Sequence, residues 1–119
     1  MSFIRIWQFR VASGRADEFR EVYGPEGAWA TLFSREQAFL GTDLFQSATD
    51  PELFITIDSW DSPEAWAAFL RTWGDDYAIL DRRCDELIVS EREVGSFLEL
   101  AIAGGAAHHA QQNAVGNDG

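Results

Sequence analysis

Cysteine is nearly absent from this sequence, and so are basic residues and long apolar segments. Cys84 is the only cysteine among 119 residues, which excludes an intramolecular disulfide and any CxxC redox or zinc motif. A reducing, cytoplasmic setting is the simplest one for such a chain. Residues 1–11 alternate polar and apolar side chains, so they form neither the apolar block of a signal peptide nor a bilayer span. We expect a cytoplasmic protein that does not enter a membrane.

Positive charge is scarce. Lysine and arginine together number 9 against 20 aspartates and glutamates, which gives a formal net charge of -11. No basic cluster interrupts this acidity, so the phosphate backbone of a nucleic acid would be repelled. The acidic residues are scattered over predicted helix faces and strand ends, as on an ordinary solvated surface. The composition therefore excludes a nucleic-acid partner, and it does not indicate any particular substrate.

Apolar residues make up 46% of the chain and aromatic residues 13%, which is enough for a packed interior. A length of 119 residues supports one such core. From residue 98 onward alanine, glycine, asparagine and glutamine dominate, with few large apolar side chains. We therefore predict one domain over residues 1–97 and a low-complexity tail over residues 98–119.

The first half of the domain reads as one strand and two helices. Residues 3–11 (FIRIWQFRV) are typical of a strand, and both of its faces carry apolar side chains. Residues 13–14 break the strand, and a helix is predicted over about 15–23. Residues 24–27 (GPEG) end this helix. A short second helix through Trp29 and Phe33 ends before Gly41.

The second half contributes three strands and a long helix. Residues 42–48 and 53–60 form a predicted antiparallel hairpin joined across 49–52 (TDPE). The run DSPE at 61–64 is a strong helix start, and the helix that follows has an apolar stripe through Leu80 and a kink at Gly74. The last strand is predicted over 87–94, which completes the order βααββαβ.

This order predicts an α+β fold of the ferredoxin-like type, a four-stranded antiparallel sheet with its helices on one face. The other face then needs a cover, because the first strand is apolar on both sides. A second copy of the chain would supply that cover. We expect a homodimer.

Several segments carry a resemblance to a known family. They are the first strand FIRIWQFRV, the helix end YGP at 23–25, the run FLG at 39–41 and the junction IDSWDS at 57–62. Together they resemble the antibiotic biosynthesis monooxygenase family over roughly residues 3–97. The resemblance implies a dimeric α/β barrel with a pocket between each sheet and its helices. Some members are oxygenases that use no cofactor and act on aromatic polyketides, and others degrade haem.

The haem-degrading branch relies on an asparagine in the first strand and on a tryptophan and a histidine in the long helix. The corresponding positions here are Trp7, Phe69 and Ile79, so the resemblance disfavours haem degradation. His108 and His109 stand side by side in the tail without a third ligand, which makes a poor metal site. We expect no metal and no cofactor.

The remaining hypothesis for the function is a cofactor-independent monooxygenase that acts on a small aromatic or quinone-like metabolite. The alternative is a homodimeric module of the same fold that binds a small ligand or a partner without catalysis. An oxygenase of this kind needs an apolar cage with one or two polar groups that stabilise a substrate anion. The pocket candidates are Arg5, Trp7, Asp43, Asp58, Trp66 and Phe69.

Each candidate also has a structural explanation. Trp7, Trp66 and Phe69 lie at spacings that core packing alone would produce. Arg5 lies between apolar neighbours on a covered face, so it must either pair with an acid such as Asp58 or hold an anion. Tyr23 is a candidate proton donor or a packed surface tyrosine, and Cys84 has no histidine partner for catalysis.

Overall fold

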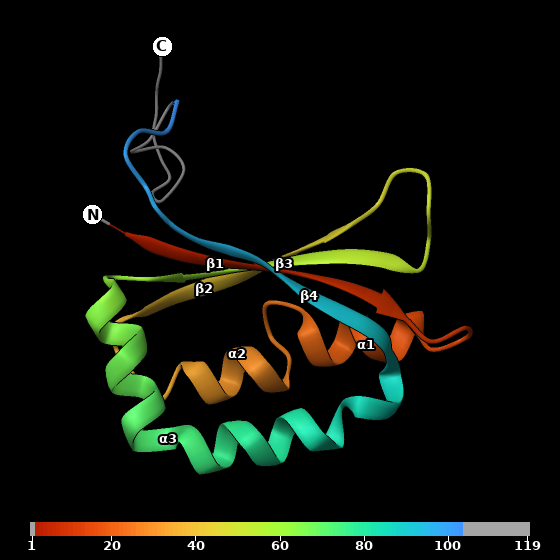
Figure 1. The fold of residues 1–119 in the computed structure, drawn as a ribbon, viewed down its shortest axis with the longest axis horizontal. Helices are drawn as coiled ribbons and strands as arrows, with labels where there is room; N and C mark the ends of the chain where they lie inside the picture. Colours follow the sequence, from red (N-terminus) through yellow and green to blue (C-terminus); the bar gives the residue numbers. More distant parts are fainter. Residues whose placement is uncertain (1, 104–119) are drawn as a thin grey trace.

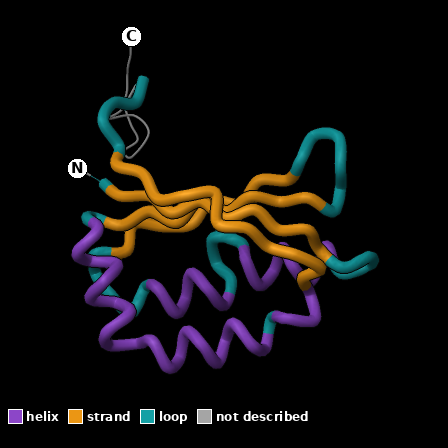
Figure 2. The backbone as a smooth tube through the Cα atoms, in the orientation of Figure 1, coloured by secondary structure: helices purple, strands orange, loops and turns teal. Residues whose placement is uncertain are grey.

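All the helices of residues 2–103, the part of the chain that the computed structural model describes, lie on one face of an antiparallel sheet (Figures 1 and 2). The four strands lie in the order β2-β3-β1-β4. Their bounds are Phe3–Val11 for β1, Phe39–Gln46 for β2, Leu53–Trp60 for β3 and Ile88–Leu98 for β4. The helices are α1 (Ala16–Tyr23), α2 (Ala28–Phe33), α3 (Pro63–Arg83) and the short 3-10 turn η1 (Asp85–Leu87). The predicted α+β ferredoxin-like fold and its element order are confirmed.

Two strands differ in extent from the prediction, each with a positive-φ glycine inside it: β2 spans 39–46 instead of 42–48, and β4 spans 88–98 instead of 87–94. Strand β2 begins at Phe39 because the register against β3 shifts between Phe39 and Gly41, where φ is 140°. Strand β4 runs on to Leu98 across two register shifts against β1, and Gly95 in this stretch has φ 157°. Such bulges add a residue without ending a strand, so alternation alone did not locate these ends. Residues 104–119, with His108 and His109, lie outside the described part of the chain.

The side of the sheet that faces the helices holds the core. Arg5, Phe9 and Val11 of β1 point to this side and are buried. The apolar core consists largely of aromatic residues: Phe9, Val11, Phe19, Tyr23, Trp29, Leu32, Phe33, Phe54, Trp60, Phe69, Cys84 and Leu87. No helix of residues 2–103 covers the opposite side of the sheet (Figure 1).

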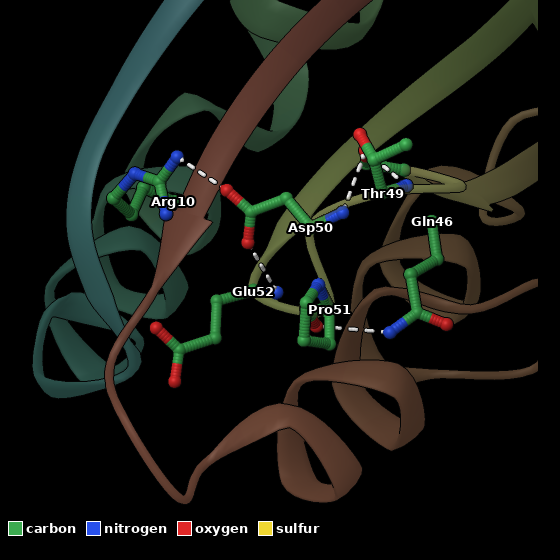
Figure 3. Close-up of polar contacts among 7 residues, drawn as sticks. Arg10, Gln46, Thr49, Asp50, Pro51 and Glu52 are labelled. Atoms are coloured by element: carbon green, nitrogen blue, oxygen red, sulfur yellow. Dashed lines mark hydrogen bonds and ion pairs between the residues drawn. The ribbon is translucent and has the colours of Figure 1, made fainter.

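The turn between β2 and β3 is fastened to β1 (Figure 3). Arg10 Nη2 donates to Asp50 Oδ2 at 2.8 Å, and the amide of Glu52 donates to Asp50 Oδ1 at 3.0 Å. Gln46 Nε2 donates to the carbonyl oxygen of Pro51 at 2.9 Å. The hydrogen bonds to Arg10 and to the Glu52 amide hold the pKa of Asp50 below its ordinary value. This turn helps to fix the register of β1 against β3.

Helix α3 begins as predicted and then bends. Ser62 Oγ accepts a hydrogen bond from the Ala65 amide at 3.1 Å, with Pro63 in the first turn. The helical path breaks at Trp73 (φ -119°, ψ 16°), one residue before the predicted position, and α3 then turns sharply beneath α2 (Figure 1). Trp73 Nε1 donates to Glu36 Oε2 at 2.9 Å. None of the helices described is long and apolar enough to cross a membrane.

Candidate functional site

A cavity of about 40 Å³ lies between the middle of the sheet and the helices. Its lining combines aromatic side chains with polar groups from three strands and from α3. The lining residues are Arg5, Trp7, Phe9, Tyr23, Trp29, Phe33, Thr42, Thr56, Asp58, Tyr77, Asp81 and Glu91. The volume is enough for a water molecule, which needs roughly 10–15 Å³ of such space.

A row of polar side chains crosses the sheet at the inner end of this cavity. The strand register sets Thr42 opposite Asp58 and Asp58 opposite Arg5, and all three residues are buried. Thr42 Oγ1 donates a 2.6 Å hydrogen bond to Asp58 Oδ1. Burial raises the pKa of Asp58 to about 6, although the Thr42 hydrogen bond and the Arg5 charge both act to lower it. A carboxyl with this pKa can exchange a proton near neutral pH.

Arg5 brings a buried positive charge to the cavity. Its guanidinium carbon lies 4.0 Å from the ring centroid of Trp66 and 5.8 Å from that of Trp7. Glu93 is the one acid of residues 2–103 in an ion pair with it, at 3.7 Å, which is too long for a hydrogen bond. Asp58 is its neighbour in register but forms no ion pair with it. The guanidinium therefore keeps unused donors inside the cavity, a costly arrangement unless a ligand or water accepts them.

The bend in α3 brings two distant aromatic residues together above Arg5. Trp66 and Tyr77 are eleven residues apart, which in a straight helix would separate them by about 16 Å along the axis. Their ring centroids are 5.9 Å apart. Burial raises the pKa of Tyr77, and the nearby Arg5 partly offsets this effect. The phenol of Tyr77 is therefore neutral at ordinary pH.

The outer end of the cavity is acidic. Asp81 of α3 is half-buried and Glu91 of β4 is exposed, so the cavity reaches solvent on their side. Tyr23 and Trp29 line the same end, and burial raises the pKa of the Tyr23 phenol well above its ordinary value. Burial likewise raises the pKa of the adjacent Cys84 thiol, which favours its protonated form.

The structure gathers only some of the predicted pocket residues. Arg5, Trp7 and Asp58 line the cavity, and Trp66 contacts it through Arg5. Asp43 does not take part, because it is exposed and pairs with Ile57 on the opposite side of the sheet. Phe69 is fully buried in the core, with its ring 5.3 Å from Phe33 and 5.4 Å from Trp60.

The positions compared with haem-degrading relatives do not converge. Trp7 lines the cavity, Phe69 lies in the core, and Ile79 is 46% exposed in a groove between α2 and α3. These three side chains therefore do not line one common pocket.

Five polar lining residues were missing from the predicted pocket: Thr42, Thr56, Tyr77, Asp81 and Glu91. Thr56 precedes Asp58 by two residues on β3, and Asp81 follows Tyr77 by four on α3, so strand and helix periodicity could have indicated them. Thr42 and Glu91 could not be found in this way, because the bulges in β2 and β4 set their register.

Comparison with known proteins agrees with this geometry. Residues 2–74 match the antibiotic biosynthesis monooxygenase family. The chain belongs to this family. The match ends within α3 near its bend, so Tyr77, Asp81 and Glu91 lie outside it. No protein with curated annotation matches the sequence.

Solved structures share the fold at low sequence identity. SnoaB from Streptomyces nogalater, described as a cofactor-independent oxygenase and crystallised as a point mutant, superposes with a TM-score of 0.68 at 20% identity over 85% of this chain and 95% of its own. A Pseudomonas aeruginosa protein superposes with a TM-score of 0.62 at 23% sequence identity, over 84% of this chain and 95% of its own. A NIPSNAP family protein from Agrobacterium tumefaciens superposes with a TM-score of 0.59 at 16% sequence identity, over 84% of this chain and 94% of its own. These similarities establish the fold, and the function has to be argued from the site.

Proposed function

We propose that the cavity binds a small phenol and that the protein is a monooxygenase that oxidises it with O₂ without a cofactor. The observation that carries this proposal is the Arg5 guanidinium, which is 8% exposed, lines the cavity and has one ion-pair partner among residues 2–103, Glu93 at 3.7 Å. A phenolate oxygen would accept directed hydrogen bonds from it while Trp7 packs against the ring. Family membership and the description of SnoaB support an oxygenase.

Asp58 is the proposed general base. With its pKa raised to about 6, the carboxyl is mainly ionised at neutral pH and still basic enough to take the phenol proton. The resulting oxyanion lies next to Arg5, its neighbour across the sheet. Burial keeps water away from both groups, which strengthens their interaction with the substrate.

The proposed reaction balances without an external reductant. The phenolate is protonated on a ring carbon to give a keto tautomer with a CH₂ group. O₂ converts this CH₂ to a second C=O, so one oxygen atom enters the ring and the other leaves as water with both hydrogens. The substrate supplies all four electrons, and phenol plus O₂ gives quinone plus water.

The size of the cavity favours a second candidate, a binding module without turnover. At about 40 Å³ the cavity is smaller than the roughly 150 Å³ that benzene occupies in a protein interior. A ring can enter only if a wall moves, and Trp66 is the side chain that covers Arg5. A site that opens for binding need not position O₂.

Oxygen uptake with 1-naphthol tests the enzyme against the binding module. We expect uptake that persists with excess EDTA and, under ¹⁸O₂, 1,4-naphthoquinone with one labelled oxygen. Arg5→Met and Asp58→Asn should abolish turnover. Arg35→Met is the matched control, because Arg35 also lies over a tryptophan, 4.7 Å from the Trp73 ring, but outside the cavity. Binding of 1-naphthol without labelled product would support the binding module instead of the enzyme. Turnover retained in Arg5→Met would refute the proposed site.

The same proposal includes a homodimer. The side of the sheet without helices carries neighbouring apolar residues, paired with one another by the strand register: Ile4, Ile6, Phe45, Ile55, Ile57 and Phe97. Phe45 is 53% and Phe97 48% exposed. Such a continuous apolar surface is typical of an interface, and the same face of a second copy would match it in shape and polarity.

A further inference from the structure

The two ends of the cavity differ in charge. Arg5 and Asp58 lie together at the inner end, whereas Asp81 and Glu91 give the outer end its negative charge. Neither of these acids forms an ion pair with any arginine of residues 2–103. Burial and the negative charge of Asp85 raise the pKa of both carboxyls. The outer end therefore lacks a positive partner.

Aromatic rings connect the two ends. Tyr23 lies 4.9 Å from Phe9 and 6.0 Å from Trp29, and Trp29 lies 5.0 Å from Tyr77, all measured between ring centroids. All four side chains line the cavity. Aromatic side chains grouped in this way, together with carboxylates, are the surroundings in which proteins recognise ammonium groups.

Two buried donors in the cavity show that it is built for a ligand rather than merely acidic. Trp29 is 7% exposed, and its Nε1 hydrogen has no acceptor among the residues described. The Arg5 guanidinium is 8% exposed, and its one ion-pair partner among these residues, Glu93, is 3.7 Å away. Unused buried donors are costly, and a ligand oxygen at the inner end would satisfy those of Arg5.

We propose that the ligand is a phenol that carries a protonated amine, with its oxygen at Arg5 and its ammonium group between Asp81 and Glu91. This inference rests on the proposed function and specifies the substrate class of the same cavity. Glu91 lies opposite Phe9, four residues along β1 from Arg5, so the two ends are about 13 Å apart at the backbone. A ring with a short amine chain would reach from one end toward the other once a wall of the 40 Å³ cavity has moved to admit it.

Three phenols of matched shape test the charge. Tyramine carries an ammonium group, 4-ethylphenol is neutral, and 3-(4-hydroxyphenyl)propanoate carries a carboxylate. Calorimetric titration at pH 7.5 and low salt should give at least about tenfold tighter binding of tyramine than of 4-ethylphenol, and the weakest binding for the propanoate. Equal affinity for tyramine and 4-ethylphenol would overturn the amine site.

A double variant locates the effect. Asp81→Asn with Glu91→Gln should remove the preference for tyramine and leave the affinity for 4-ethylphenol within about twofold. Glu64→Gln with Asp75→Asn is the control, because it changes the net charge equally at two exposed positions of α3. Loss of the preference in the control would show a general charge effect and would also overturn the proposal.

The outcomes separate the two proposals. If 4-ethylphenol binds, Arg5→Met abolishes its binding and tyramine gains nothing, then the phenol site stands and the amine site is wrong. If none of the three phenols binds, both proposals are wrong. If tyramine alone binds and the double variant abolishes this binding, both hold.

Discussion

Thr42 and Asp58 face each other across β2 and β3, and the Thr42 hydroxyl donates a 2.6 Å hydrogen bond to the buried Asp58 carboxyl. One neutral donor compensates little of the hydration that a carboxylate loses on burial. The pKa of Asp58 therefore rises to about 6 instead of falling. The same residue is a cost to folding and, in our proposal, the base of the reaction.

Asp58→Asn should stabilise the protein above pH 6. The raised pKa means that the folded state binds this proton more tightly than the unfolded state, so stability falls as pH rises from about 4 to about 6. The shift from 3.8 to about 6 corresponds to roughly 3 kcal/mol at about 1.4 kcal/mol per pKa unit. Asparagine keeps the acceptor for Thr42 and has no charge.

Urea unfolding of both proteins at equal concentration, at pH 4 and at pH 7.5, measures this difference. The variant should gain stability relative to the wild type between the two pH values. A constant difference would mean that Asp58 titrates normally and would remove the argument for it as a base.

The hydrogen bond from Trp73 to Glu36 should hold the bend of α3. Removing the donor in Trp73→Phe or the acceptor in Glu36→Ala should each destabilise the protein, and the double variant should show a coupling of about 1.5–3 kcal/mol, as for a bond to a charged group. The bend places Tyr77 against Trp66, so both variants should also weaken phenol binding. Zero coupling in the double-mutant cycle would show that packing alone sets the bend.

Ile57→Asp should break the dimer. Ile57 lies on the apolar face, paired with Ile6 and Asp43, and a second carboxylate beside that of Asp43 would add a like charge to the buried interface. Ile79→Asp is the matched control, because Ile79 is 46% exposed in the groove between α2 and α3, away from the apolar face. Light scattering at micromolar concentration should give a monomer only for Ile57→Asp. A monomeric wild type would refute the proposed interface.

The sequence predicted the fold well because local patterns encode it. The two-sided apolar pattern of residues 3–11 and the helix start at Ser62 and Pro63 appear where they were predicted. The strand bounds at Phe39 and Leu98 were missed, because bulges at Gly41 and Gly95 are set by pairing with neighbouring strands.

The site was predicted only in part. Arg5 stood out as a charge on a covered face, and the structure places it in the cavity. Asp43 failed as a pocket candidate because its position next to the buried Thr42 points it to the other side of the sheet. Tyr77 reaches the cavity because α3 bends at Trp73, and helical periodicity does not predict this bend.

Binding of 4-ethylphenol to Arg5→Met tests the central claim most directly, since the claim is that the buried Arg5 guanidinium holds the oxygen of a phenol. Calorimetric titrations should compare the wild type, Arg5→Met and the matched control Arg35→Met, each with a melting curve that confirms folding. We predict that Arg5→Met weakens binding about 10- to 100-fold, as expected for a lost hydrogen bond to a charged group, while Arg35→Met binds like the wild type. Unchanged affinity in a folded Arg5→Met would contradict the account and assign Arg5 to the core.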